Sequence, residues 1–425
     1  MVINKYPERD EWAAIIERPY ADNSAVLEAV LGLLDEVRSK GDAALYDFAL
    51  RFDGVSLEAL VVTPVEIREA EAMLDDNLKA AIEAAYQNIR TFHAAQLKPE
   101  AAVETAPGIH CWRRNVAIER VGLYIPGGTA PLFSTVLMLG VPAQLAGCPE
   151  VVLCTPPARD GSVHPAILFA ASLCGITYIV KAGGAGAIAA LAQGTTSVPR
   201  VYKIFGPGNQ YVTAAKQMVQ QAGVAIDMPA GPSEVCVIAD ENANAAFVAA
   251  DLLSQAEHGA DSQVLLLTDD PALVEKVQSA IGDQLTLLPR AAVARKALEQ
   301  SRIVLLGSIA EAMELANAYA AEHLILQCAD AGEWAGKVRN AGSVFIGAYS
   351  PESVGDYASG TNHTLPTNGY ARAYSGVSTD SFVKKITFQQ LTKEGLEGIA
   401  QTVTTMAEAE GLRAHADAVR VRLKT

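Results

Sequence analysis

From residue 121 onward, short runs of β-branched residues alternate with longer segments rich in Ala and Leu, and Gly or Pro separates them. Such short apolar runs between turn residues are typical of buried strands. The repeating order of strand, turn and helix favours a parallel sheet with right-handed crossovers, which predicts an α/β fold. The predicted strands lie at 121–128, 151–157, 176–184, 201–208, 234–240, 263–270, 323–328 and 342–350.

This part of the chain contains a faint internal repeat, in pattern more than in identity. The helix and strand that end in VVLCTPP resemble those that end in VLLLTDD, and VYKIFGPG resembles SVFIGAYSPES. We therefore predict two related open-sheet units in series, at 121–234 and 235–377.

The remaining segments have helical patterns. Residues 24–98 carry apolar residues at i, i+3, i+4 and i+7, and we assign residues 22–120 to the second unit. Residues 1–21 are predicted to form an N-terminal arm. Residues 378–425 are polar and helical with an apolar stripe, so we predict a C-terminal tail that packs on another subunit.

The composition excludes several classes of protein. The chain has 425 residues, of which 50% are hydrophobic and 19% charged, so it is long enough for more than one core and too apolar to be disordered. A net charge of −15 argues against nucleic-acid and anionic-membrane partners. No run is apolar enough to span a bilayer, and the charged N-terminus does not resemble a signal peptide. Six cysteines without paired spacing favour free thiols in a reducing cytoplasm.

Polar residues from distant segments suggest a metal site. Gln255 and His258 are three residues apart, so on a helix they share a face. Asp356 and His415 add a carboxylate and a second imidazole, and these donor types suit a metal such as zinc. Taken alone, each residue has an ordinary explanation. Gln255 and His258 would form a polar helix end, Asp356 would form an Asx-turn in a loop, and His415 would be a surface histidine.

The adjacent pair Glu322-His323 is a candidate acid/base couple. His323 suits a general base because an unperturbed imidazole titrates near neutral pH. Glu322 suits the activation of a water molecule. Neighbours in an extended segment point to opposite faces, so we expect the two side chains to contact different atoms. The alternative is a helix-terminal histidine beside a solvated glutamate.

Longer motifs identify a family resemblance. The chain resembles histidinol dehydrogenases from about residue 25 to its C-terminal end, in the family's order and spacing. This resemblance implies a zinc-dependent homodimer that oxidises L-histidinol to L-histidine through the aldehyde, with two NAD+. It also implies two incomplete doubly wound (Rossmann-like) domains with small N- and C-terminal helical parts. The tail is then exchanged between subunits, so that the active sites are shared. The motifs are VGLYIPGGTAPLFSTVLMLGVPAQLAGC, KIFGPGNQYVTAAK, IDMPAGPSEV, DLLSQAEHGADSQV, AEHLILQ and VGDYASGTNHTLPT.

The resemblance also implies roles for individual residues. One Zn2+ per subunit is bound by Gln255, His258, Asp356 and His415, which also face the substrate. His323 is the general base and Glu322 activates water. Further substrate contacts come from Ser233, His363 and Glu410. The unit at 121–234 binds NAD+ through Tyr124 and Asn209, and the other unit carries the zinc site.

The cofactor side departs from the family at one position. Gly184-x-Gly186-x-x-Ala189 fits the dinucleotide fingerprint formally, but no acidic residue follows about twenty positions later. The family normally has Gln at position 186, where it contacts NAD, so Gly186 removes one amide contact.

Three alternatives remain open. Relatives can oxidise other amino or sulfonated alcohols with the same zinc ligands, although the substrate-side set is complete here. A non-catalytic zinc-binding protein is the second alternative, and the intact Glu322-His323 pair argues against it. The third is covalent catalysis by a thiolate at Cys111 or Cys148; Cys148 has no His or Lys beside it, whereas Cys111 follows His110.

Overall fold

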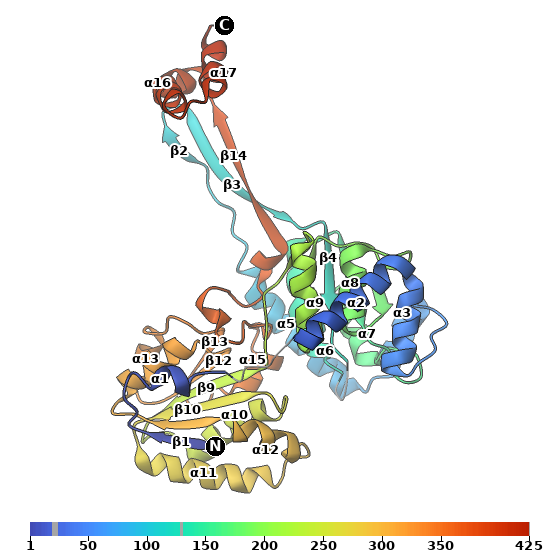
Figure 1. The fold of residues 1–425 in the computed structure, drawn as a ribbon, viewed down its shortest axis with the longest axis vertical. Coiled ribbons are helices and arrows are strands. Elements are labelled where there is room, and N and C mark those ends of the chain that lie inside the picture. Colours follow the sequence, from blue (N-terminus) through green and yellow to red (C-terminus); the bar gives the residue numbers. More distant parts are fainter. Residues whose placement is uncertain (19–23, 128–130, 425) are drawn as a thin grey trace.

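The structure, a computed structural model, describes residues 1–18, 24–127 and 131–424. Its described residues form two parallel sheets, of five and six strands, and one antiparallel sheet of three strands. We call the parts built on the parallel sheets the five-stranded lobe and the six-stranded lobe. The antiparallel sheet and the last two helices form an extended arm that projects away from both lobes (Figure 1).

The five-stranded lobe has the strand order β6-β5-β4-β7-β8, and every neighbouring pair is parallel. Its strands are β4 (Arg120–Tyr124), β5 (Glu150–Thr155), β6 (Tyr178–Lys181), β7 (Lys203–Phe205) and β8 (Ala225–Ile226). The crossover helices are α6 (Phe133–Ala146), α7 (Pro165–Leu173), α8 (Gly184–Gln193) and α9 (Gln210–Gln221). Two apolar clusters pack on this lobe, one containing α8 and α9 and the other containing α6 and α7.

The six-stranded lobe has the order β1-β11-β10-β9-β12-β13, again with parallel neighbours. Its strands are β1 (Val2–Lys5), β9 (Glu234–Ala239), β10 (Gln263–Thr268), β11 (Arg302–Leu305), β12 (His323–Gln327) and β13 (Ser343–Ile346). Its helices are α1 (Trp12–Ile15), α10 (Ala245–Ala256), α11 (Pro271–Leu285), α12 (Ala291–Glu299), α13 (Ile309–Tyr319), α14 (Ala331–Ala335) and α15 (Glu352–Tyr357). Separate cores cover the two faces of the sheet.

The internal repeat predicted from the sequence reappears as topology. When the strands are numbered in chain order from β4 and from β9, the five-stranded sheet reads 3-2-1-4-5, and the six-stranded sheet has the same order with β1 added beside strand 3. A complete doubly wound sheet adds a sixth strand to this order, so both lobes are incomplete versions of that fold. The predicted fold class is confirmed. In each lobe the order reverses beside the first strand, where α/β proteins usually bind ligands at the carboxyl ends of the strands.

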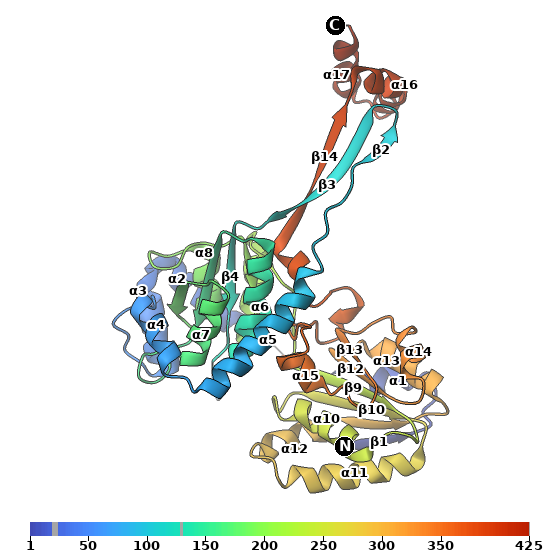
Figure 2. The ribbon, with the colours of Figure 1, turned by 180° about the vertical axis from the view of Figure 1, so that it is seen from behind.

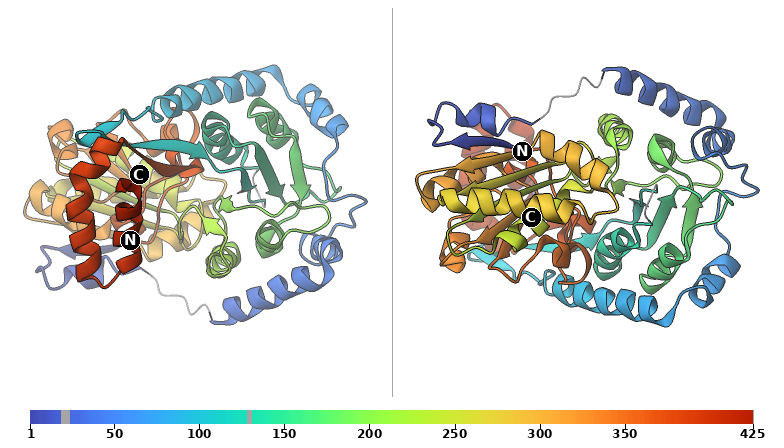
Figure 3. Two further views of the ribbon diagram at one scale, coloured as in Figure 1. Left: turned by 90° about the horizontal axis from the view of Figure 1, so that it is seen from above. Right: turned by 90° about the horizontal axis from the view of Figure 1, so that it is seen from below.

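The assignment of residues 22–120 to the unit at 235–377 is wrong. Residues 24–94 pack on the five-stranded lobe, with the segments 24–48 and 76–94 on opposite faces (Figure 3). The stripe of Val26, Val30, Leu34 and Val37 joins the same core as α8 and α9. The backbone N of Val62 also donates to Ile179 O at 2.9 Å. The helices concerned are α2 (Ser24–Lys40), α3 (Asp42–Phe48), the π-helical segment Ala49–Asp53, α4 (Pro64–Ala72) and α5 (Asp76–Ala94).

Both ends of the chain also differ from the prediction. The first residues do not form a separate arm, because β1 pairs with β11 at the edge of the six-stranded sheet. The boundary proposed at residue 21 lies outside the described residues. In the arm, strand order is β14-β3-β2, built from β2 (Val103–Ala106), β3 (Ile109–Ala117) and β14 (Val383–Leu391), with α16 (Lys393–Ala409) and α17 (Arg413–Leu423) at its end (Figure 2). The predicted tail helices are present, whereas β14 was not expected. None of the helices described is long and apolar enough to cross a membrane.

Candidate active site

His323 is held in one tautomer by a backbone carbonyl. It begins β12 and is 3% exposed, and its Nδ1 lies 3.2 Å from Glu234 O. Because a carbonyl can only accept, the ring proton is on Nδ1 and Nε2 carries the free lone pair. Nε2 has no hydrogen-bond partner and lies 3.7 Å from Asp356 Oδ1. Burial lowers the pKa of His323 to about 3, so the ring is neutral and able to accept a proton.

Glu322 lies beside His323 rather than on the opposite face, so that expectation is wrong. Its Oε2 accepts from the backbone N of Glu234 at 2.9 Å and is 3.7 Å from His323 Nδ1. Glu322 precedes the strand, where alternation of side chains no longer applies. Burial raises the pKa of Glu322 well above its usual range, and neighbouring carboxylates raise it further. The two residues therefore share one anchor, the backbone of Glu234.

Three of the four predicted metal ligands lie on the six-stranded lobe. Gln255 is in the last turn of α10 and His258 follows the helix, with His258 N donating to Gln255 O at 3.2 Å. The side chain of Gln255 is fully buried, yet neither its oxygen nor its nitrogen has a hydrogen-bond partner. An unpaired buried amide is unfavourable, which indicates that a ligand completes the site. His258 is exposed by area, although partial desolvation by the surrounding protein still lowers its pKa.

Asp356 lies on the short helix α15 and not in a loop as expected. Glu352 is one turn before it, and ligand atoms of His258, Glu352 and Asp356 all lie within 4.8 Å of one another. Ser254 Oγ donates to Glu352 Oε2 at 2.7 Å. Burial raises the pKa of both carboxyl groups, and Asp356 adds to the effect on Glu352. Such crowded carboxyl groups favour a cation, which stabilises their ionised forms.

Glu352 was not found from the sequence. Its only signal is the i, i+4 spacing to Asp356, and that spacing has meaning only once the segment is known to be helical.

Two other predicted substrate residues lie at the edge of the same region. His363 Nδ1 is 2.9 Å from Asp356 O, while its Nε2 is 3.1 Å from Thr135 Oγ1 on α6. The ring therefore joins the two lobes, and burial lowers its pKa to about 4. Ser233 directly precedes β9, and its carbonyl accepts from Gln263 N at 3.2 Å.

The remaining two predicted residues are far from this cluster within one chain. Glu410 directly follows α16 and His415 is in α17, at the end of the arm, and both are exposed (Figure 1). The structure of a single chain therefore does not bring them to Gln255, His258 and Asp356.

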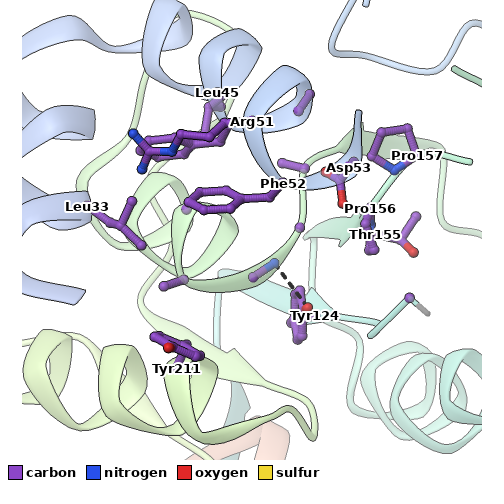
Figure 4. A pocket seen from close by; sticks show the side chains of 18 of the residues that line it. Leu33, Leu45, Arg51, Phe52, Asp53, Tyr124, Thr155, Pro156, Pro157 and Tyr211 are labelled. Carbon is purple, nitrogen blue, oxygen red and sulfur yellow. Dashed lines mark hydrogen bonds between the residues drawn. The ribbon is translucent and has the colours of Figure 1, made fainter. Parts of the chain in front are cut away.

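A cavity of about 1050 Å³ lies at the carboxyl ends of β4, β5 and β6 in the five-stranded lobe (Figure 4). Both predicted NAD contacts line it. Tyr124 is buried, its hydroxyl accepts from Gly184 N at 3.1 Å, and burial raises its pKa to about 12. Asn209 Oδ1 caps α9 by accepting from Tyr211 N and Val212 N. The cavity sits where a doubly wound sheet binds a nucleotide.

The fingerprint segment forms the start of α8, and its residues Gly184 and Gly186 also line this cavity. A Cβ atom at Gly186 would lie 2.5 Å from Phe48 Cδ2, so a larger residue does not fit beside that ring. Asp53 lines the cavity as well, and partial burial raises its pKa. Asp53 is thus an acidic residue that reaches this cavity from an earlier segment of the chain.

The cysteines do not support a thiolate nucleophile. All six are free. Burial raises the pKa of Cys148 to about 11, and it also raises the thiol pKa values of Cys154, Cys174 and Cys236. A raised pKa disfavours the reactive thiolate form. Cys111 lies on β3 in the arm.

Comparisons with known proteins identify relatives of this chain. The family model described as histidinol dehydrogenase matches residues 16–423. A histidinol dehydrogenase of Bacteroides thetaiotaomicron is 57% identical over 425 residues, covering 100% of this chain and 99% of the relative. One of Colwellia psychrerythraea is 53% identical over 412 residues, covering 96% and 95%. The crystal structure of histidinol dehydrogenase from Elizabethkingia anophelis superimposes with a TM-score of 0.98 at 54% identity, covering 100% of this chain and 98% of that one. With a family match over nearly its whole length, this chain belongs to the histidinol dehydrogenase family.

Proposed function

We propose that this chain oxidises L-histidinol to L-histidinal and then to L-histidine, with two NAD+ as hydride acceptors. Family membership makes it an oxidoreductase of histidine biosynthesis. The observation that carries the proposal is the unprotonated Nε2 of His323, which is buried, unpartnered and 3.7 Å from Asp356 Oδ1 in a cluster of metal-ligand types.

The donor set fits one Zn2+ per subunit. Gln255, His258 and Asp356 would hold it, and His415 of the partner subunit would complete four ligands. The unpaired amide of Gln255 and the accessible imidazole of His258 support this assignment. When bound, zinc supplies a template for the nitrogen atoms of histidinol, since it has no redox role of its own.

His323 acts as the general base. Loss of a hydride from an alcohol carbon requires loss of the hydroxyl proton, and His323 Nε2 can accept it. The carbonyl of Glu234 holds the tautomer that leaves Nε2 free. After the transfer, both ring nitrogens carry protons, and the carboxylate of Asp356 stabilises the resulting charge.

Glu322 serves the second oxidation. An aldehyde is oxidised as its hydrate, so a water molecule has to lose a proton while it adds to the carbonyl carbon. Because burial raises the pKa of Glu322, its carboxylate is a stronger base for this transfer than an exposed glutamate. Ser233, His363 and Glu410 of the partner subunit are the proposed contacts to the rest of the substrate.

The five-stranded lobe binds NAD+ in its cavity, with Tyr124 and Asn209 in contact with the dinucleotide. The position of the cavity at the carboxyl ends of parallel strands supports this role. His363 links Asp356 to Thr135 of the cofactor lobe, so the two lobes meet beside the reacting atoms.

The active form is proposed to be a homodimer with shared sites. The arm exposes large apolar side chains that a single chain leaves in water. An arm of this kind buries its apolar surface by packing on a second copy, which would carry Glu410 and His415 to the partner's cleft. The exposed side chains include Val103, Leu391, Met406, Leu412 and Val421.

A turnover assay tests the function directly. Purified protein is incubated with histidinol and NAD+, and NADH and histidine are measured, with other amino alcohols as competing substrates. We expect two NADH for each histidine and little oxidation of alcohols that lack the imidazole. Preferred oxidation of a different alcohol would favour another enzyme on this scaffold. Zinc binding without turnover of any alcohol would favour a binding protein.

A further inference from the structure

The backbone of Glu234 contacts both proposed catalytic residues. Its N–H donates to Glu322 Oε2 at 2.9 Å, and its carbonyl lies 3.2 Å from His323 Nδ1. Glu234 also directly follows Ser233, a proposed substrate contact. A shift of this one residue would therefore turn the base, move the carboxyl group and displace the serine together.

The side chain of Glu234 is held by a partly buried arginine. Arg18 donates from Nε to Oε1 at 2.5 Å and from Nη2 to Oε2 at 2.8 Å, and this fork matches the carboxylate. The side chains are 15% and 3% exposed, respectively. The backbone N of Asn368 adds a third bond, to Oε1 at 2.9 Å.

Arg18 itself has a defined position. Its Nη2 donates to Tyr319 O at 2.8 Å, and its guanidinium lies 4.1 Å from the centre of the Tyr319 ring. Arg18 comes from the N-terminal segment, while Glu234 lies on the central strand β9. The contact thus connects a distant part of the chain to the backbone that orients the site.

We propose that Arg18 and Glu234 are positioning residues: their ion pair holds the backbone of residue 234 so that His323 keeps its Nδ1–H tautomer and Glu322 keeps its orientation. This inference rests on the proposed function. Neither side chain of the pair contacts the reacting atoms. A buried ion pair adds little stability over an apolar pair of the same shape, but it imposes one geometry. Arg and Lys are not equivalent in such a site, because only Arg supplies the fork.

The test compares Arg18→Met and Arg18→Lys with wild type. Turnover is measured with histidinol and with histidinal separately, together with bound zinc and melting temperature. A displacement of about 1 Å at a catalytic group reduces rate about 100-fold. We therefore expect kcat to fall about 10- to 100-fold in Arg18→Met for both substrates, with zinc content within about twofold. Arg18→Lys should recover part of kcat because it keeps the charge and one donor.

Arg302→Met is the matched control. Arg302 Nε anchors the same N-terminal segment by donating to Ile15 O at 3.1 Å, but it does not contact Glu234. It should lower the melting temperature and leave kcat unchanged. An equal fall of kcat in Arg302→Met would overturn the proposal in favour of general docking of the segment.

A second readout does not depend on turnover. Nitrogen-15 NMR of histidine-labelled protein reports the tautomer of each ring, and His323 is assigned by its loss in His323→Asn. His323 should show the Nδ1–H pattern in wild type and a mixture of the two tautomers in Arg18→Lys. Because Arg18→Lys keeps the buried charge, it provides this test even where Arg18→Met does not fold. Wild-type kcat and an unchanged tautomer in Arg18→Lys would overturn the proposal. If wild type does not oxidise histidinol, the proposed function fails, while this comparison still tests the pair.

Discussion

The ring of Phe48 fills the space beside Gly186, where an added Cβ atom would lie 2.5 Å from Phe48 Cδ2. Both residues line the cofactor cavity, and Phe48 belongs to the core that joins α3 to α8. A glutamine at position 186, as the family resemblance implies, therefore requires the ring to move. Gly186 and Phe48 have to be considered together.

Gly186→Ala should destabilise the chain and weaken NAD+ binding. Overpacking of a core costs about 1–3 kcal/mol, and the added methyl group pushes Phe48 into the cavity. Gly282→Ala is the control, since Gly282 is also helical but has no atom within 4 Å of its added Cβ. That change should stabilise the chain by about 0.5–1 kcal/mol. Thermal unfolding and NAD+ titration measure both effects. Unchanged stability of Gly186→Ala would contradict this prediction, because it would mean that the Phe48 ring moves aside without a cost in free energy.

Glu322→Gln should impair the second half-reaction more than the first. Only the aldehyde step needs an activated water molecule, whereas both steps need the base, so His323→Asn should impair both. Removal of one general acid/base lowers rate about 10²- to 10⁴-fold. Single-turnover rates with histidinol and with histidinal separate the steps. Glu314→Gln makes the same change on the exposed surface of α13 in the same lobe, and it should leave the rates of both steps unchanged. An equal loss in both steps for Glu322→Gln argues against its assigned role.

Two inactive variants should complement each other if the sites are shared. A His258→Asn chain mixed with a His415→Asn chain forms one hybrid site in which both ligands are intact. Refolding the two chains together should restore part of the activity. In the control mixture, His258→Asn with Asp356→Asn, both proposed hybrid sites carry a defect, and no activity should return. Equal recovery in both mixtures, or none in either after proven subunit exchange, would contradict sharing through the arm.

The buried carboxyl group of Asp251 should make stability depend on pH. Burial raises its pKa to about 7, and it accepts a hydrogen bond from Gln327. The folded state binds the Asp251 proton more tightly than the unfolded state does. The stabilisation of the fold by this proton is therefore complete below the unfolded pKa near 4 and is lost as pH rises through about 7.

Asp251→Asn should therefore stabilise the chain at pH 8 and change little at pH 4. One pKa unit corresponds to about 1.4 kcal/mol, which sets an upper limit of about 4 kcal/mol for the gain. Melting temperatures at several pH values measure it, with the exposed Asp283→Asn as the control. A gain that is the same at every pH would contradict the raised pKa.

Local pattern predicted eight of the eleven strands in the two lobes and missed β1, β8 and β11, and it did not predict the partners of the helices. The stripe along 24–40 shows that one face is buried, and this is all that periodicity can show. Which sheet covers that face depends on contacts such as Val30 against α8, more than 100 residues away in the chain. The strands of the arm were missed for a related reason: β3 and β14 stabilise each other by pairing across the chain and have little core of their own.

The site was predictable where its chemistry is local. Gln255 and His258 are separated by less than one helical turn, and Glu322-His323 is a dipeptide, so both stand out in the sequence. Glu234 does not, because it acts through its backbone, and Arg18 reaches it from 216 residues away. No spacing rule connects such residues before the fold is known.

Removal and return of the metal is the most direct measurement of the central claim, that Gln255, His258 and Asp356 hold a metal on which histidinol oxidation depends. After treatment with a chelator, we expect histidinol turnover to be lost while circular dichroism stays unchanged, because each lobe has its own apolar core. Stoichiometric Zn2+ should restore turnover in wild type but not in His258→Asn. Full turnover by metal-free protein, or unfolding of the lobes on chelation, would contradict the claim.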